Sequence, residues 1–313
     1  MHSRPSKGLL LLARITNIVM FVVLMVGFLV TETGSAQGCG RHWPLCDGHF
    51  TPPFDLHGFV EYGHRLVSGI EGLLVIWLAI WAWRALRRAP EVKVLAVLMV
   101  LFTYIQALLG AEAVLFPTSP FILATHFGIS LIAFAATLLL DVRLHQAADS
   151  GPNGEVGWTW RRRHVPPRLR LLVWLTSLYI IGVVYLGALV AHTSTGLFCG
   201  NGWPLCNGSV LPPLGGEVWI PYVHRVAAFI AMLLVLWIFL WSRRLRNRPD
   251  VRRAASWSLV LILLQALSGW YLIASNIALG AIMIHITLLT VLFGVMSYLD
   301  LQVAPETAPD QSR

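Results

Sequence analysis

The chain has 313 residues, of which 57% are hydrophobic and only 12% are charged. Soluble domains carry about 25% charged residues, so this chain cannot cover a compact globule of its size with polar surface. Its formal net charge of +8 comes from basic residues grouped in short segments between long apolar runs. This pattern is typical of membrane topology, and it argues against a soluble enzyme, a disordered chain and a protein with nucleic acid as a partner.

Eight apolar stretches are long enough to cross a bilayer as helices, which takes about 20 residues each. The expected fold class is therefore an all-α membrane protein with eight transmembrane helices. The first stretch is too long for the apolar core of a signal peptide, so we expect it to be retained. The predicted spans are residues 9–31, 62–83, 94–116, 121–141, 171–193, 219–241, 254–275 and 278–299.

Lysine and arginine set the expected orientation of these spans. One alternating set of loops holds nearly all of them, whereas the opposite set holds only Arg41, with Arg65 and Arg225 at the mouths of helices. By the positive-inside rule the first set is cytoplasmic, and so are both termini. The short N-terminus has no transit peptide, which favours a multi-pass protein of a bacterial plasma membrane.

The chain is internally duplicated. The segment GCGRHWPLC at residues 38–46 reappears 160 positions later as FCGNGWPLC at residues 198–206. Other features recur at an offset of 159 or 160, so chance is a poor explanation. The repeat pairs Cys39 with Cys199, Cys46 with Cys206, His64-Arg65 with His224-Arg225, Gln106 with Gln265, and His126 with His285.

Four spans separate equivalent points, so the two halves have the same membrane orientation and form a parallel repeat. We expect residues 1–145 to form an N-terminal four-helix bundle and residues 171–300 a C-terminal one. Residues 146–170, rich in Gly, Pro and Arg, are expected to be a cytoplasmic linker. Residues 301–313 are polar and are expected to be a disordered tail.

Histidines occupy matched positions near the outer ends of spans 2, 4, 6 and 8. Ionisable groups inside a membrane are costly and usually functional. The alternative is that each histidine is neutral and only hydrogen-bonded to a neighbouring helix, but this explains poorly why four of them lie at matched depth. Two imidazoles from two helices can ligate a haem iron from both faces, whereas a compact zinc site takes three or four ligands. The sequence therefore predicts one haem site at His64 and His126 and another at His224 and His285.

Arginine and cysteine residues flank the predicted sites. Arg65 and Arg225 each follow a predicted ligand, where a guanidinium can either pair with a haem propionate or extend into the membrane interface. In each cysteine pair six residues intervene, which is too wide for a C-x-x-C redox motif. Both pairs lie outside the cytoplasm, so we expect each to close a small loop by a disulfide, with redox exchange with a partner as the alternative.

Glu61 is the main difference between the halves, because Pro221 stands at the equivalent position. Glu61 lies one turn before His64 and shares its helix face. A carboxylate beside an iron porphyrin can accept a proton, stabilise a cation or attack one, whereas a carboxylate at a helix N-terminus can simply cap it. Its absence from the second half favours a functional role.

These features together resemble the haem A synthase family over residues 8–300. The resemblance rests on two four-helix halves, the four histidines, the Glu61-Tyr62-Gly63-His64-Arg65 stretch and two outer cysteine pairs. It implies an oxidoreductase that converts a methyl group of haem O into the formyl group of haem A by successive hydroxylations, for use in terminal oxidases. Haem b is the implied cofactor.

The resemblance also implies roles for individual residues. By similarity, His224 and His285 hold the haem b iron, His64 and His126 ligate the substrate haem, and Glu61 is the catalytic carboxylate. Each cysteine pair matches the bacterial pattern, in which it forms a disulfide. The implied partners are the lipid bilayer, haem O synthase (a farnesyltransferase) and assembly factors for cytochrome oxidase, and a homo-oligomer is compatible with the pattern.

Two other functions remain open from the sequence. A di-haem b-type membrane cytochrome, transferring electrons between quinone and an outer partner, would need the same histidine pairs but not a carboxylate in one half only. A haem or small-molecule transporter would need a continuous polar path, whereas spans 1, 5 and 8 have almost no polar residues at their centres.

Overall fold

The computed structural model describes residues 4–87, 89–116, 119–149, 165–200, 202, 205–211 and 215–305. Within these ranges it contains eight helices that are long and apolar enough to cross a membrane, which confirms the expected fold class. A single turn of 3-10 helix, η1 (Gly216–Val218), precedes the sixth long helix. The long helices are α1 (Lys7–Glu32), α2 (Leu56–Ala85), α3 (Pro90–Leu115), α4 (Pro120–Ala148), α5 (Pro167–His192), α6 (Trp219–Ser242), α7 (Pro249–Ala274) and α8 (Leu279–Val303).

Local sequence signals explain where the helices start. Proline is the first residue of α3, α4, α5 and α7, where its fixed φ suits the first turn and its missing N–H costs nothing. Helix α2 starts at Leu56, six residues before the predicted span, because the Asp55 carboxylate accepts a hydrogen bond from Gly58 N at 2.7 Å.

Helices α4 and α8 run past the predicted boundaries of the linker and the tail, at the end opposite the cysteines. Helix α4 runs to Ala148, past the start of the expected linker, and α8 runs to Val303, past the start of the expected tail. Residues 150–164 of that linker and 306–313 of that tail lie outside the described residues.

Ion pairs allow α4 to continue through a charged stretch. Asp141 Oδ2 lies 3.0 Å from Arg14 Nε of α1, and the fully buried Arg143 lies 2.8 Å from Glu91 of α3. Buried charges are tolerated when they are paired, so these contacts permit helix where hydropathy alone ends the span.

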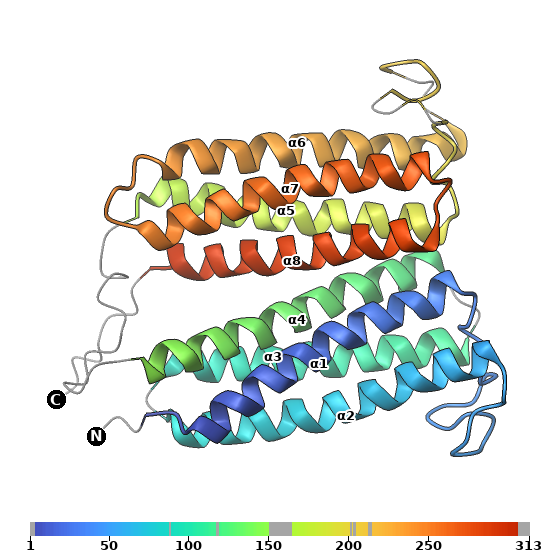
Figure 1. Ribbon diagram of the computed structural model, residues 1–313, viewed down its shortest axis with the longest axis horizontal. Helices are drawn as coiled ribbons and strands as arrows, with labels where there is room; N and C mark the ends of the chain where they lie inside the picture. Colours follow the sequence, from blue (N-terminus) through green and yellow to red (C-terminus); the bar gives the residue numbers. More distant parts are fainter. Residues whose placement is uncertain are drawn as a thin grey trace.

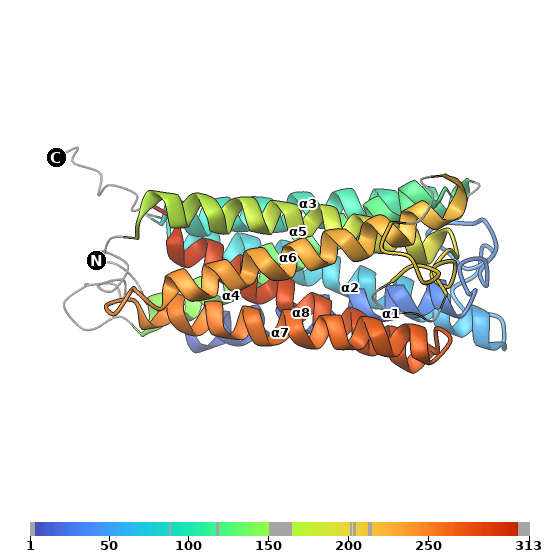
Figure 2. The same ribbon diagram turned by 90° about the horizontal axis from the view of Figure 1, so that it is seen from above.

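The helices pack as two four-helix bundles (Figure 1). In the first bundle α1 contacts α2, α2 contacts α3, α3 contacts α4, and α4 contacts α1, so that α2 and α4 stand across the ring from each other. Helices α5 to α8 repeat this ring, with α6 and α8 across from each other. The bundles meet through α1 and α4 of the first and α5 and α8 of the second, and the perpendicular view shows all eight helices running roughly along one axis (Figure 2).

Both cysteine loops lie at one end of the molecule, here called the disulfide end, and the start of α1 and the end of α8 lie at the other, the terminal end (Figure 1). Disulfides join Cys39 to Cys46 and Cys199 to Cys206. In both loops a two-residue turn follows the second cysteine, Asp47-Gly48 in one and Asn207-Gly208 in the other, with φ between 50° and 79° at all four residues. Such sequences favour tight hairpin turns, so the duplication preserves the loop geometry.

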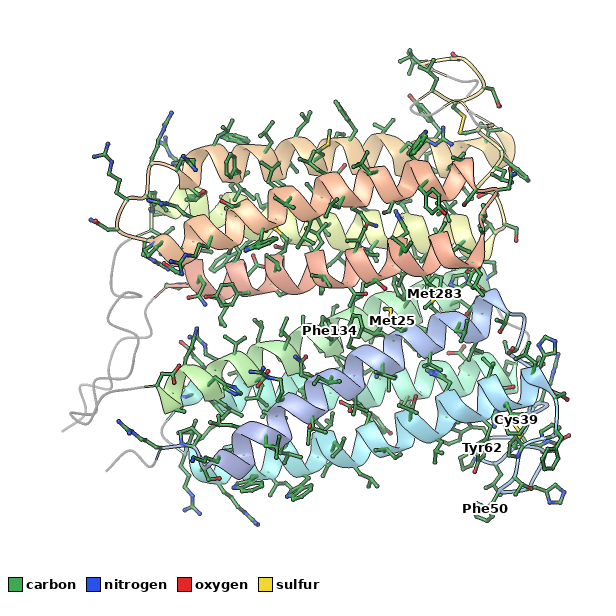
Figure 3. The ribbon with its side chains drawn as sticks, viewed as in Figure 1. Met25, Cys39, Phe50, Tyr62, Phe134 and Met283 are labelled. Atoms are coloured by element: carbon green, nitrogen blue, oxygen red, sulfur yellow. A yellow bond between two sulfur atoms is a disulfide. The ribbon has the colours of Figure 1, made fainter. Side chains whose placement is uncertain are left out.

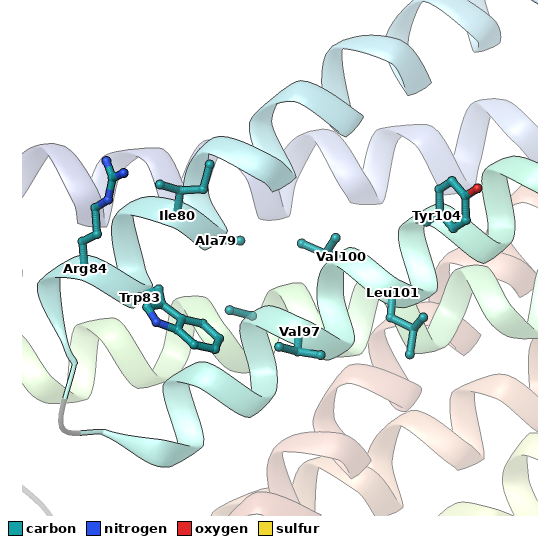
Figure 4. Close-up of a pocket in the computed structure, with 9 residues that line it drawn as sticks. Ala79, Ile80, Trp83, Arg84, Val97, Val100, Leu101 and Tyr104 are labelled. Atoms are coloured by element: carbon teal, nitrogen blue, oxygen red, sulfur yellow. The ribbon is translucent and has the colours of Figure 1, made fainter.

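A hollow of about 500 Å³ opens between α2 and α3 toward the terminal end (Figure 4). Its lining is almost entirely apolar and includes Ile80, Trp83, Val97 and Tyr104. None of the predicted ligands and neither Glu61 nor its neighbour Arg65 lines it. This surface therefore suits contact with lipid rather than the predicted chemistry.

Candidate functional site

The four predicted ligands stand on the diagonally opposed helices of the two bundles. His64 of α2 and His126 of α4 belong to the first ring, and His224 of α6 and His285 of α8 to the second. The fold therefore brings together the same two pairs that the sequence analysis predicts, one inside each bundle.

Each imidazole packs against a glycine of a neighbouring helix, a feature that the sequence analysis missed. A Cβ added at Gly27 would lie 2.9 Å from Cε1 of His64, and one added at Gly187 would lie 2.8 Å from Cε1 of His224. The glycines are related by the offset of 160, so the repeat register could have revealed them. The other two contacts, with a Cβ 3.4 Å from the ring, are Gly110 with His126 and Gly269 with His285.

The donor set of each half fits a haem better than a compact metal centre. Among the described residues no group of three or more His, Cys, Asp or Glu side chains could hold a metal ion. Two opposed imidazoles match the axial ligands of a porphyrin iron instead. His64, His126 and His224 each bury an Nδ1 atom that has no hydrogen-bond partner in the described ranges, so these ring nitrogens are available.

His285 is held more firmly than the other three histidines. The Ser268 hydroxyl lies 2.8 Å from its Nδ1, and Gln265 Nε2 of α7 lies 3.1 Å from its Nε2. A hydrogen bond at Nδ1, such as that of Ser268, orients an imidazole whose Nε2 ligates a metal. The Gln265 amide would have to move away from Nε2 for an iron to bind there. The counterpart of Ser268 in the first half is Leu109, which cannot make this contact. The second half is therefore the better preorganised of the two sites.

Glu61 is buried and hydrogen-bonded through both oxygens. Its Oε2 accepts a hydrogen bond from Cys39 N at 2.7 Å, and its Oε1 lies 2.5 Å from Arg65 Nη2. Because Asp55 caps α2, Glu61 is not the capping residue of that helix. The carboxylate instead ties the first disulfide loop to the helix face that carries His64. Figure 3 shows Cys39 near Tyr62, whose hydroxyl donates to Phe50 O.

Arg65 and Arg225 anchor the two disulfide loops in the same way. Arg65 Nη1 donates to the carbonyl oxygens of His42 and Leu45, both at 2.7 Å, and Arg225 Nη1 donates to Leu205 O at 2.6 Å. Their remaining groups differ, because Arg225 Nη2 is buried without a hydrogen-bond partner among the residues that the structure describes, whereas Arg65 Nη2 binds Glu61. Arg225 thus keeps a free donor for an anionic group, since Pro221 replaces the carboxylate there.

The glycine contacts predict a sharp difference between two substitutions on α5. Gly187→Ala places a methyl group 2.8 Å from the His224 ring, which must shift. We expect haem affinity in the second half to fall by about 10- to 100-fold, the usual effect of disturbing groups that orient a ligand. Gly182→Ala is the matched control, because a Cβ there meets nothing within 4 Å. Visible spectra of the two purified variants check this, and equal haem content would contradict it.

Comparison with known proteins agrees with these features. The chain is 39% identical over 296 residues to a heme A synthase of Symbiobacterium thermophilum, covering 94% of both chains. It is 41% identical over 308 residues to a heme A synthase of Bacillus licheniformis, covering 96% of this chain and 97% of the relative. The profile of the cytochrome oxidase assembly protein family (COX15-CtaA) matches residues 53–297, which include all four histidines and Glu61. The chain therefore belongs to the cytochrome oxidase assembly protein family.

Proposed function

We propose that this chain is a haem A synthase, which oxidises a methyl group of haem O to the formyl group of haem A. The single observation that carries the proposal is the carboxylate of Glu61, fixed one turn from His64 in only one of two duplicated histidine sites. The relatives bear the name heme A synthase. A di-haem cytochrome is not favoured, because electron transfer alone gives no reason for one site to differ in this way.

We assign the substrate to the first half and the cofactor to the second. His64 and His126 ligate haem O, and His224 and His285 hold haem b. Two features support this division. Ser268 orients the His285 ring, which suits a permanently bound haem. Arg225 buries an N–H group that has no partner in the described part of the chain and suits a propionate. When bound, haem b supplies one-electron transfer to an acceptor.

The reaction replaces two hydrogens of a methyl group by the oxygen of water and releases four electrons and four protons. Two successive hydroxylations give a gem-diol, which loses water to form the aldehyde. Glu61 is held in place by two donors, so its negative charge is preorganised near the substrate iron ligand. A fixed anion stabilises positive charge that develops on the methyl carbon, or orients the attacking water.

The membrane orientation of the protein is inferred from its charge distribution, and its partner enzymes from its family. We propose that the terminal end faces the cytoplasm of a bacterial plasma membrane and that the disulfide end faces outward. Haem O synthase catalyses the reaction that must supply the substrate, and cytochrome oxidase with its assembly factors receives the product. The spans alone establish that the chain is a multi-pass membrane protein.

Extraction of bound porphyrins tests the proposed function directly. The chain is expressed together with a haem O synthase in a host that makes no haem A. We expect the membranes to gain haem A and the purified chain to carry haem b together with haem O or haem A. A cytochrome would carry haem b alone, and that result would overturn the proposal. A His64→Ala, His126→Ala double variant serves as the control and should make no haem A.

A further inference from the structure

A polar stripe continues below His64 along the inward face of α2. Ser68 lies one turn and Glu71 two turns further into the membrane, at spacings that keep them on the His64 face. Glu71 is only 1% exposed. Both of its carboxylate oxygens and the Ser68 hydroxyl are buried without a hydrogen-bond partner in the described part of the chain. An unpartnered carboxyl group inside a bundle is costly, so it calls for a ligand.

The second half lacks this stripe altogether. At the offset of 160, Ala228 stands in place of Ser68, and the buried Ala231 stands in place of Glu71. The helix, the histidine and its glycine contact are all retained. The polar groups are therefore not required to build this kind of bundle, and they distinguish what the first half binds from what the second half binds.

The position of the stripe matches the rim of a ligated porphyrin. A ring held between His64 and His126 stands perpendicular to the line that joins its two ligands, and so roughly along the bundle axis. Ser68 and Glu71 lie about 6 and 10 Å from His64 along the helix, at 1.5 Å per residue. Side chains at these levels can therefore meet groups on the edge of the macrocycle rather than its metal.

Resting on the proposed function, we infer that Glu71 and Ser68 form a hydrogen-bonding subsite for the hydroxyl group on the isoprenoid side chain of the substrate. Haem O differs from haem b by this hydroxylated chain, which replaces a vinyl group. A buried site built to bind a hydroxyl rejects an analogue that lacks it, because its polar groups then stay unpaired. The alanines of the second half suit haem b, which has no such hydroxyl.

A comparison of two binding titrations tests the inference with a readout that is independent of turnover. Purified full-length chain that retains its second-half haem b is titrated with haem O and, separately, with haem b, and binding is followed by visible absorbance. We expect wild type to bind haem O more tightly than haem b. Glu71→Ala should reduce the ratio of these two affinities by at least about tenfold, the usual effect of losing one hydrogen bond to a carboxylate. Glu71→Gln, which keeps hydrogen-bonding atoms, should retain part of it.

The controls separate this inference from folding and from the proposed function. Retained second-half absorbance shows that each variant is folded, and Ser68→Ala should reduce the preference less than Glu71→Ala. An unchanged preference in both Glu71 variants overturns the subsite but leaves the synthase intact. A wild-type chain that never binds haem O overturns the proposed function itself.

Discussion

Replacing His224 by alanine is expected to abolish the low-spin absorbance of haem b. In the proposed function, His224 of α6 and His285 of α8 would hold the haem b iron, and both helices belong to the second bundle. Loss of one imidazole leaves the iron with a single strong protein ligand, and the space against Gly187 stays empty. A reduced-minus-oxidised spectrum of the purified variant and the haem content after extraction measure the effect.

His192→Ala is the matched control for this experiment. His192 is the last residue of the neighbouring helix α5 and lies at the disulfide end, yet it belongs to neither ligand pair. Its ring packs 6.4 Å from Phe28 of the first bundle, so its loss should leave the spectrum of haem b intact. Normal haem b content in His224→Ala, or equal losses in both variants, would contradict the assignment of His224 as a ligand.

Replacing Glu61 by glutamine is expected to stop haem A formation while haem b remains bound. Glutamine has nearly the same shape and keeps an oxygen that can accept the hydrogen bond of Cys39 N, so the first disulfide loop should stay in place. It removes the negative charge opposite Arg65 and beside the proposed substrate site. Loss of preorganised charge of this kind typically lowers a rate by about 100- to 1000-fold.

The measurement for Glu61→Gln is the pigment composition of membranes that also contain haem O synthase. Haem O or its alcohol should accumulate, haem A should fall below a few per cent of the wild-type yield at the expected rate loss, and the haem b spectrum should persist. Glu112→Gln, a change in another carboxylate of the first half, provides the control and should behave as wild type. A normal haem A yield in Glu61→Gln would remove Glu61 from the chemistry.

The sequence by itself determined the number of spans and the duplication, and it predicted the histidine pairs. A bilayer requires about 20 apolar residues for each crossing, so spans are visible in hydropathy. A repeat at one offset marks matched residues without any knowledge of contacts, and it separated His64 with His126 from His224 with His285. Helix ends were less predictable, since they depend on a cap such as Asp55 and on the ion pair of Asp141.

Only the tertiary structure decided which groups meet across helices. Both the core and the lipid-facing sides of these helices are apolar, so hydropathy does not tell which face points inward. Packing between segments produces three such features. It buries Glu71, it brings Gly187 against the His224 ring, and it places Cys39 N where it donates to Glu61. Such contacts depend on the distances between helices and loops, which no periodicity within one segment encodes.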